Sequence, residues 1–132
     1  MVKKIDHIAI IVKDADAALK AYSEMFDFKV VEQMAGPGGE FKAVLVRAGE
    51  ITLEFLQPLK AGTAFDRFLK ERGGGLHHVS FATDDIVKEL KALKAQGKRL
   101  QNEEPIVLPK AKIDFIHPAT AENVLIELVQ RG

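Results

Sequence analysis

The sequence predicts an α+β fold built from two copies of one βαβββ unit. The expected elements run strand, helix and three strands, and this order then repeats. The two halves also match in residues: HIAIIVKDADAALK (7–20) corresponds to HVSFATDDIVKELK (78–91), and TLEFLQ (52–57) corresponds to LIELVQ (125–130). A repeat of about half the chain indicates a duplicated unit, since solenoid arrays have shorter periods.

The first half supplies every element of one unit. KIDHIAIIV (4–12) is β-branched and apolar, which predicts a strand. Asp14 or Asp16 then offers a helix N-cap. The apolar residues behind the cap recur at helical spacing: Ala18, Leu19, Tyr22 and Phe26. Three strands with turn residues between them complete the unit: 28–34, 41–48 and 51–57.

The second half repeats this plan after a short connecting helix within 61–72, which three glycines end. GLHHVSFAT (75–83) is the next predicted strand, and Asp84 or Asp85 supplies the next cap. The following helix keeps its apolar residues at helical period and ends at Gly97. Three strands are again expected: 99–101, 111–117 and 124–130.

Length and composition fit one ordinary soluble domain, with 132 residues, 47% hydrophobic and 29% charged. We expect its two repeats at about 4–58 and 75–130, joined by a helical connector at 59–74. Lys plus Arg and Asp plus Glu both number 19, which gives no sign of a nucleic-acid or membrane partner. The lack of cysteine excludes disulfides and thiolate ligands. Without a signal-peptide or transmembrane pattern, the expected location is cytoplasmic.

Four residues of metal-ligand type lie at corresponding places in the two halves: His7, Glu54, His78 and Glu127. Because strand side chains alternate between faces, each shares a face with mostly apolar or small residues. Taken alone, each would be read as a hydrogen-bonded histidine or a solvent-facing glutamate. A buried carboxylate, however, is normally paired, protonated or bound to metal. The repeated set therefore favours a divalent metal such as Zn, Co, Ni, Mn or Fe.

Two other histidines have less specific patterns. His77 points to the opposite face of its strand from His78, which predicts a surface or supporting position. His117 precedes Pro118 at a strand end, where a structural role and a place at the rim of the cleft are equally compatible with the sequence.

Four stretches together resemble the vicinal oxygen chelate superfamily, which includes the glyoxalases: DHIAIIVKDADAALKAY, ITLEFLQPL, GGGLHHVSF and HPATAENVLIELVQ. Within it, they are most similar to the methylmalonyl-CoA epimerases. The resemblance implies paired βαβββ modules that form a curved sheet around a metal cleft, and a homodimer. It implies one divalent ion (Co, Mn, Ni or Zn) and carries the family's metal ligands onto four residues: His7, Glu54 (Gln in some epimerases), His78 and Glu127.

The resemblance also implies an isomerase that removes and returns the α-proton of a short 2-acyl-CoA thioester. The metal would chelate two substrate oxygens and stabilise the enolate. Glu127 matches a family glutamate that binds metal and acts as the base. Two alternatives stay open: a glyoxalase I-type lyase acting on a thiol–aldehyde adduct, which uses the same ligands, and a small-ligand binding or resistance protein, which commonly lacks them.

Two departures from the epimerase pattern bear on mechanism and substrate. Some epimerases carry a second acid on the third strand, where Ala43 is the nearest match here, so Glu54 or water would have to serve as the second base. The loop before the His-Pro pair contains Pro105 and Pro109 and no glycine, so the acyl group and the substrate-binding residues are unassigned. The sequence is also compatible with pairing of the two modules within one chain or across a dimer.

Overall fold

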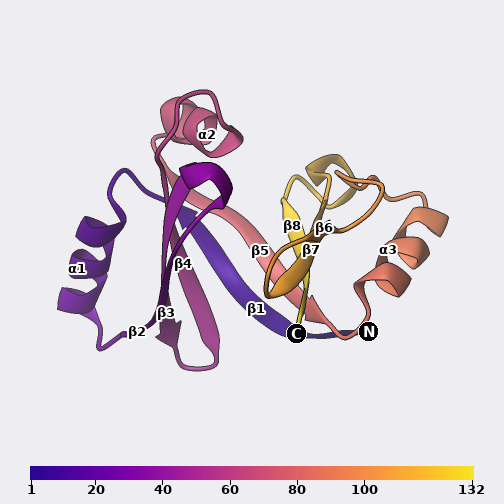
Figure 1. Cartoon of the computed structure of the whole chain (residues 1–132), viewed down its shortest axis with the longest axis horizontal. Coiled ribbons are helices and arrows are strands. Elements are labelled where there is room, and N and C mark those ends of the chain that lie inside the picture. The colour runs from indigo at the N-terminus through magenta and orange to yellow at the C-terminus, as the bar shows by residue number, and fades with distance from the viewer. The chain divides into compact units, whose positions relative to one another are not determined.

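A computed structural model describes all residues from 1 to 132, and its elements follow the predicted order (Figure 1). In chain order they are β1 (Val2–Ile11), α1 (Ala15–Met25), β2 (Lys29–Ala35), η1 (Pro37–Gly39), β3 (Phe41–Ala48), β4 (Ile51–Pro58), α2 (Ala64–Arg72), β5 (Gly75–Thr83), α3 (Ile86–Ala95), β6 (Ile106–Val107), β7 (Ala111–Ile116), η2 (Pro118–Thr120) and β8 (Ile126–Arg131). The α+β class and the βαβββ order of each half are confirmed. None of the helices has the length and apolar character needed to cross a membrane.

The chain packs into two compact units. The first unit is His7–His77, and the second unit combines Met1–Asp6 with His78–Gly132. In the first unit the strand order is β2-β3-β4-β1, with β1 and β4 parallel and the other neighbours antiparallel. Helix α1 packs on one face of this sheet, over Val44 and Phe55. Helix α2 packs on the other face through Phe65 and Phe68.

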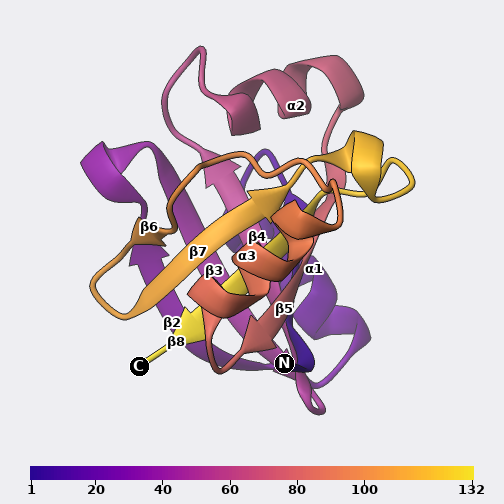
Figure 2. The same cartoon turned by 90° about the vertical axis from the view of Figure 1, so that its right-hand side faces the viewer.

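The second unit repeats this arrangement. Its strands are ordered β6-β7-β8-β5, with β5 and β8 parallel and the other neighbours antiparallel. Helix α3 packs Ile86 and Leu90 against Ile116 and Leu128 on one sheet face. Figure 2 shows α3 in front of β7 and β8. In each unit, the helix that follows the first strand (α1 or α3) therefore covers one face of the sheet. The histidine and the glutamate lie on the opposite face.

A glutamine fixes each of these helices to the strand that carries the glutamate. Gln57 accepts a hydrogen bond from the first N–H of α1 at 2.9 Å, and Gln130 accepts one from the first N–H of α3 at 2.9 Å. Asp14 and Asp85 are the N-caps, and their carboxylates accept further N–H groups of the first turn. Because these N–H groups have no partner inside the helix, the repeated bonds explain why both halves end in a Glu-x-x-Gln sequence.

One predicted strand is wrong. Residues 99–101 do not form a strand: Leu100 makes an isolated bridge to Ile116, and the edge strand is β6 instead. The reason is the fully buried carboxylate of Asp114. Its Oδ1 accepts hydrogen bonds from the backbone N–H of Asn102 at 3.2 Å and from the Asn102 side-chain amide at 3.0 Å. These bonds hold the backbone at Asn102 in a loop, because a side chain that binds a backbone group competes with strand pairing.

His77 packs against α2 in the first unit and is partly buried there, away from the surface position considered from the sequence. Its imidazole lies edge-on to the rings of Phe65 and Phe68, with centroid distances of 5.1 Å and 4.8 Å. Burial, and to a smaller extent the positive charge of Arg72, lowers the pKa of His77 from 6.5 to about 4. The folded protein therefore holds this side chain neutral at pH values where the unfolded chain protonates it.

We expect His77→Phe to reduce the acid sensitivity of the fold. Above pH 6.5, His77 is neutral in both states. Between pH 6.5 and pH 4 only the unfolded chain gains the proton, so the free energy of unfolding falls as the pH falls. Protonation of this histidine in the unfolded chain should lower the free energy of unfolding by about 2 kcal/mol between pH 7.5 and pH 5. Urea unfolding of both proteins, in chelator to exclude metal, measures the difference, and an equally steep loss in His77→Phe would contradict it.

Candidate metal centre

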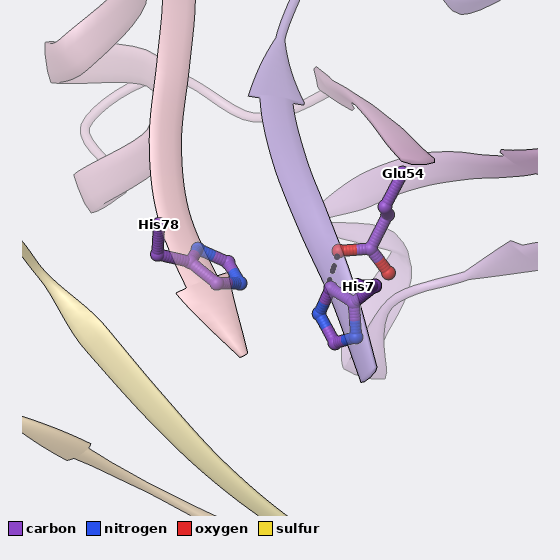
Figure 3. Close-up of side chains that lie close together, drawn as sticks. All are labelled: His7, Glu54 and His78. Carbon is purple, nitrogen blue, oxygen red and sulfur yellow. Dashed lines mark ion pairs between the residues drawn. The ribbon is translucent and has the colours of Figure 1, made fainter. Parts of the chain in front are cut away.

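The first unit holds one histidine–glutamate pair on its sheet. His7 lies on β1 and Glu54 on the parallel neighbour β4, and Figure 3 shows the two side chains pointing toward one another. His7 Nε2 is 3.6 Å from Glu54 Oε1, and the side chains are only 6% and 13% exposed. Ala9 is the register partner of Glu54, and it belongs to the buried apolar cluster of this face. A titratable pair is thus embedded among apolar side chains.

The second unit holds the equivalent pair. His78 lies on β5 and Glu127 on the parallel neighbour β8, with His78 Nε2 3.7 Å from Glu127 Oε2 and side chains 2% and 8% exposed. The Ser80 hydroxyl donates a hydrogen bond to Glu127 Oε1 at 2.7 Å. The Phe115 ring lies edge-on to the His78 imidazole, with ring centroids 5.4 Å apart. Both side chains of the pair are therefore held by a neighbour from their own unit.

Both nitrogen–oxygen distances fit two ligands of one ion better than a direct hydrogen bond. A hydrogen bond between nitrogen and oxygen spans about 2.7 to 3.2 Å. Two ligand atoms that each lie about 2.1 Å from a tetrahedral ion are roughly 3.4 Å apart. A buried carboxylate also needs a compensating positive charge or a proton. The chemistry and spacing of each pair therefore suit half of a site for a divalent cation.

The four residues selected from the sequence thus come together as two equivalent pairs: His7 with Glu54, and His78 with Glu127. Within each pair, the histidine comes from the first strand of the βαβββ unit and the glutamate from its last strand. The pairing follows from the strand register, which is parallel in both units.

Sequence reasoning missed Ser80, which it treated only as a small neighbour of His78. The available signal was the repeat itself, since it aligns Ser80 with Ala9 and so places a hydroxyl opposite one glutamate and a methyl group opposite the other. His117 has a structural role, which is one of the two roles open from the sequence. Its Nδ1 accepts the Ala119 N–H at 3.0 Å and caps the short helix η2.

Comparison with known proteins connects this geometry to a family. The family profile described as Glyoxalase/Bleomycin resistance protein/Dioxygenase superfamily matches residues 6–117. The mitochondrial methylmalonyl-CoA epimerase of Bos taurus is 31% identical over 129 residues, which cover 96% of this chain and 74% of the relative. The ethylmalonyl-CoA/methylmalonyl-CoA epimerase of Cereibacter sphaeroides is 30% identical over 133 residues, which cover 98% of this chain and 99% of the relative.

Solved structures show the same similarity. A variant of Streptomyces coelicolor methylmalonyl-CoA epimerase in complex with 2-nitronate-propionyl-CoA aligns with a TM-score of 0.93 and 27% identity. The alignment covers 100% of this chain and 99% of that one. The likeness therefore extends over both βαβββ modules.

Proposed function

Because the chain belongs to the glyoxalase/bleomycin resistance protein/dioxygenase superfamily, we propose that it is a metal-dependent epimerase acting on a short 2-acyl-CoA thioester of the methylmalonyl kind. The observation that carries the proposal is the pair of equivalent His–Glu half-sites, with nitrogen–oxygen distances of 3.6 and 3.7 Å. Relatives named as methylmalonyl-CoA epimerases, alike over nearly the whole chain, support the reaction and the substrate class.

We propose that the two pairs together hold one divalent ion, either Co, Mn, Ni or Zn. Two imidazole nitrogens and two carboxylate oxygens form a donor set that these ions accept. When bound, the ion supplies a Lewis acid for the two oxygens of a carboxylate and a thioester carbonyl. What supports a single centre is the donor set, because each pair offers one imidazole nitrogen and one carboxylate oxygen, and two pairs supply the four ligands that such an ion takes.

The chain's own residues would carry the proton. In the proposed step, a Glu127 oxygen takes the α-proton, and the electron pair of the broken C–H bond moves into the thioester carbonyl to give the enolate. Return of a proton to the opposite face of that carbon gives the epimer. Glu54 is the other carboxylate of the two pairs, and Glu54 or a water molecule supplies this second transfer. The third strand, FKAVLVRA (41–48), contains no acid that could serve. Ala43, at the position of the second acid in some epimerases, is fully buried in the apolar cluster under α2.

The first experiment is proton–deuterium exchange at the α-carbon of methylmalonyl-CoA in heavy water. The protein is stripped with chelator and assayed before and after reloading with Co²⁺ or Mn²⁺. We expect exchange only after reloading. Bound metal without exchange would contradict the epimerase, and turnover of a thiol–aldehyde adduct by the same preparation would indicate a glyoxalase-type lyase. A reloaded protein that binds no metal would contradict the four-residue centre.

We further propose that the protein is a homodimer. The edge strand β2 is exposed along its whole length and presents Val30, Val31 and Met34, which are 40 to 47% exposed. An edge strand with exposed apolar side chains supports an interface between proteins. Sedimentation equilibrium tests this state, and cell fractionation tests the predicted cytoplasmic location.

A further inference from the structure

The two His–Glu pairs differ in one side chain. In the parallel register, the residue opposite Glu127 is Ser80, and the residue opposite Glu54 is Ala9. Ser80 is completely buried, and its hydroxyl donates to Glu127 Oε1 at 2.7 Å. A hydroxyl bound to a carboxylate at this length is a charge-assisted hydrogen bond, which is about twice as strong as a neutral one. Only the second unit has this contact built into its strand register.

We propose that Ser80 is a positioning residue for the metal half-site of the second unit. Its hydroxyl holds Glu127 through Oε1, and this leaves Oε2, which lies 3.7 Å from His78 Nε2, as the oxygen offered to the ion. The inference rests on the metal centre of the proposed function and goes beyond it by adding a residue that binds neither metal nor substrate.

The physical reason is the number of torsions that a glutamate ligand must order. A free glutamate side chain rotates about three bonds, and the loss of this freedom opposes metal binding. The Ser80 hydroxyl orders the carboxylate in the absence of metal, because serine itself has a single side-chain torsion and this one is enclosed within the sheet. Partners of this kind orient metal ligands and tune the affinity of the site.

The rest of the second unit holds the other ligand of the pair in a similar way. Phe115 packs edge-on against the His78 ring, and the backbone N–H of Phe115 is held by Asp114 Oδ1 at 2.8 Å. Asp114 is itself fully buried. The imidazole and the carboxylate of this half-site are therefore both oriented before an ion binds, by Phe115 and by Ser80.

The test is a Co²⁺ titration of chelator-stripped, full-length protein, followed by calorimetry and by the visible absorption of bound Co²⁺. Ser80→Ala should raise the dissociation constant about 10- to 100-fold and change the absorption spectrum. Ser80→Thr keeps a hydroxyl and should restore most of the affinity. Thr83→Val is the matched control, because it removes another buried hydroxyl of β5, one that donates to the Met1 carbonyl. Its dissociation constant should equal that of the wild type.

A double-mutant cycle separates positioning from a general effect on the fold. If Ser80 acts through Glu127, then Ser80→Ala should cause no further loss of affinity in the Glu127→Ala background, where no side-chain oxygen is left to accept the Ser80 hydroxyl. Wild-type affinity in folded Ser80→Ala, or an equal loss in both backgrounds, would overturn the proposal. Should thermal melting show that Ser80→Ala is unfolded, Ser80→Cys, with a similar volume and a weak donor, takes its place and should lose affinity in the same way.

The outcome is independent of the epimerase reaction, because the titration contains no substrate. Unchanged affinity in Ser80→Ala, together with α-proton exchange by the wild type, would overturn only the positioning role. Weakened affinity in Ser80→Ala without exchange by the wild type would overturn only the epimerase reaction.

Discussion

Glu127→Gln is expected to abolish metal-dependent α-proton exchange while the chain stays folded. A positioned general base contributes about 10²- to 10⁴-fold to a rate, and an amide cannot accept the proton that the carboxylate takes. Glutamine has nearly the same size, and its amide oxygen can still accept the hydrogen bond that Ser80 now donates to Glu127 Oε1. Exchange measured at saturating Co²⁺, alongside thermal melting, tests the prediction.

Glu54→Gln is the matched control for this prediction, since it makes the same chemical change in the equivalent pair of the first unit. Some epimerases have glutamine at this position, so we expect Glu54→Gln to keep a large part of the exchange rate once metal occupancy is equal. A similar loss in both variants would mean either that Glu54 and not water supplies the second proton transfer, or that each glutamate acts only as a ligand. Full activity in Glu127→Gln would remove Glu127 from the reaction.

Most of the fold could be predicted because the sequence repeats its local signals. Strands 41–48 and 75–83 have the predicted bounds, since turn residues and a helix-ending glycine mark both sides. The predictions failed where a side-chain hydrogen bond or a turn with positive φ angles decides where a strand begins. Asp114 holds the segment after Leu100 in a loop. The last strand begins two residues later than expected, at Ile126, after a turn in which Glu122 and Asn123 have φ of 54° and 66°.

The same distinction applies to the candidate site. The residues of the two pairs could be selected from the sequence because strand periodicity and the repeat place them on one face of each unit. The contacts that orient these residues could not be predicted from the sequence. Whether the Ser80 hydroxyl reaches a glutamate oxygen depends on the strand register and on side-chain torsions, and neither is encoded in residue spacing. The partner that orients a ligand is therefore seen only in the structure, although the ligand is visible in the sequence.

His7→Ala and His78→Ala are each expected to lower the metal affinity more than the loss of an orienting partner would. Loss of a side chain that orients a metal ligand typically lowers the metal affinity about 10- to 100-fold. Loss of a ligand itself should therefore lower the metal affinity at least about 100-fold. Metal content after dialysis and Co²⁺ titration measure the effect. His117→Ala is the control, because this histidine is exposed and caps η2. Unchanged metal content in His7→Ala would remove His7 from the centre.

Mixing the two variants decides whether a centre takes both pairs from one chain. His7→Ala and His78→Ala chains are unfolded together and refolded, so that hybrid dimers form. If each centre combined one pair from each subunit, every hybrid dimer would regain one intact centre, about a quarter of all sites in the mixture. We expect no recovery. Recovery of about a quarter of the sites would contradict a centre whose four ligands belong to a single chain.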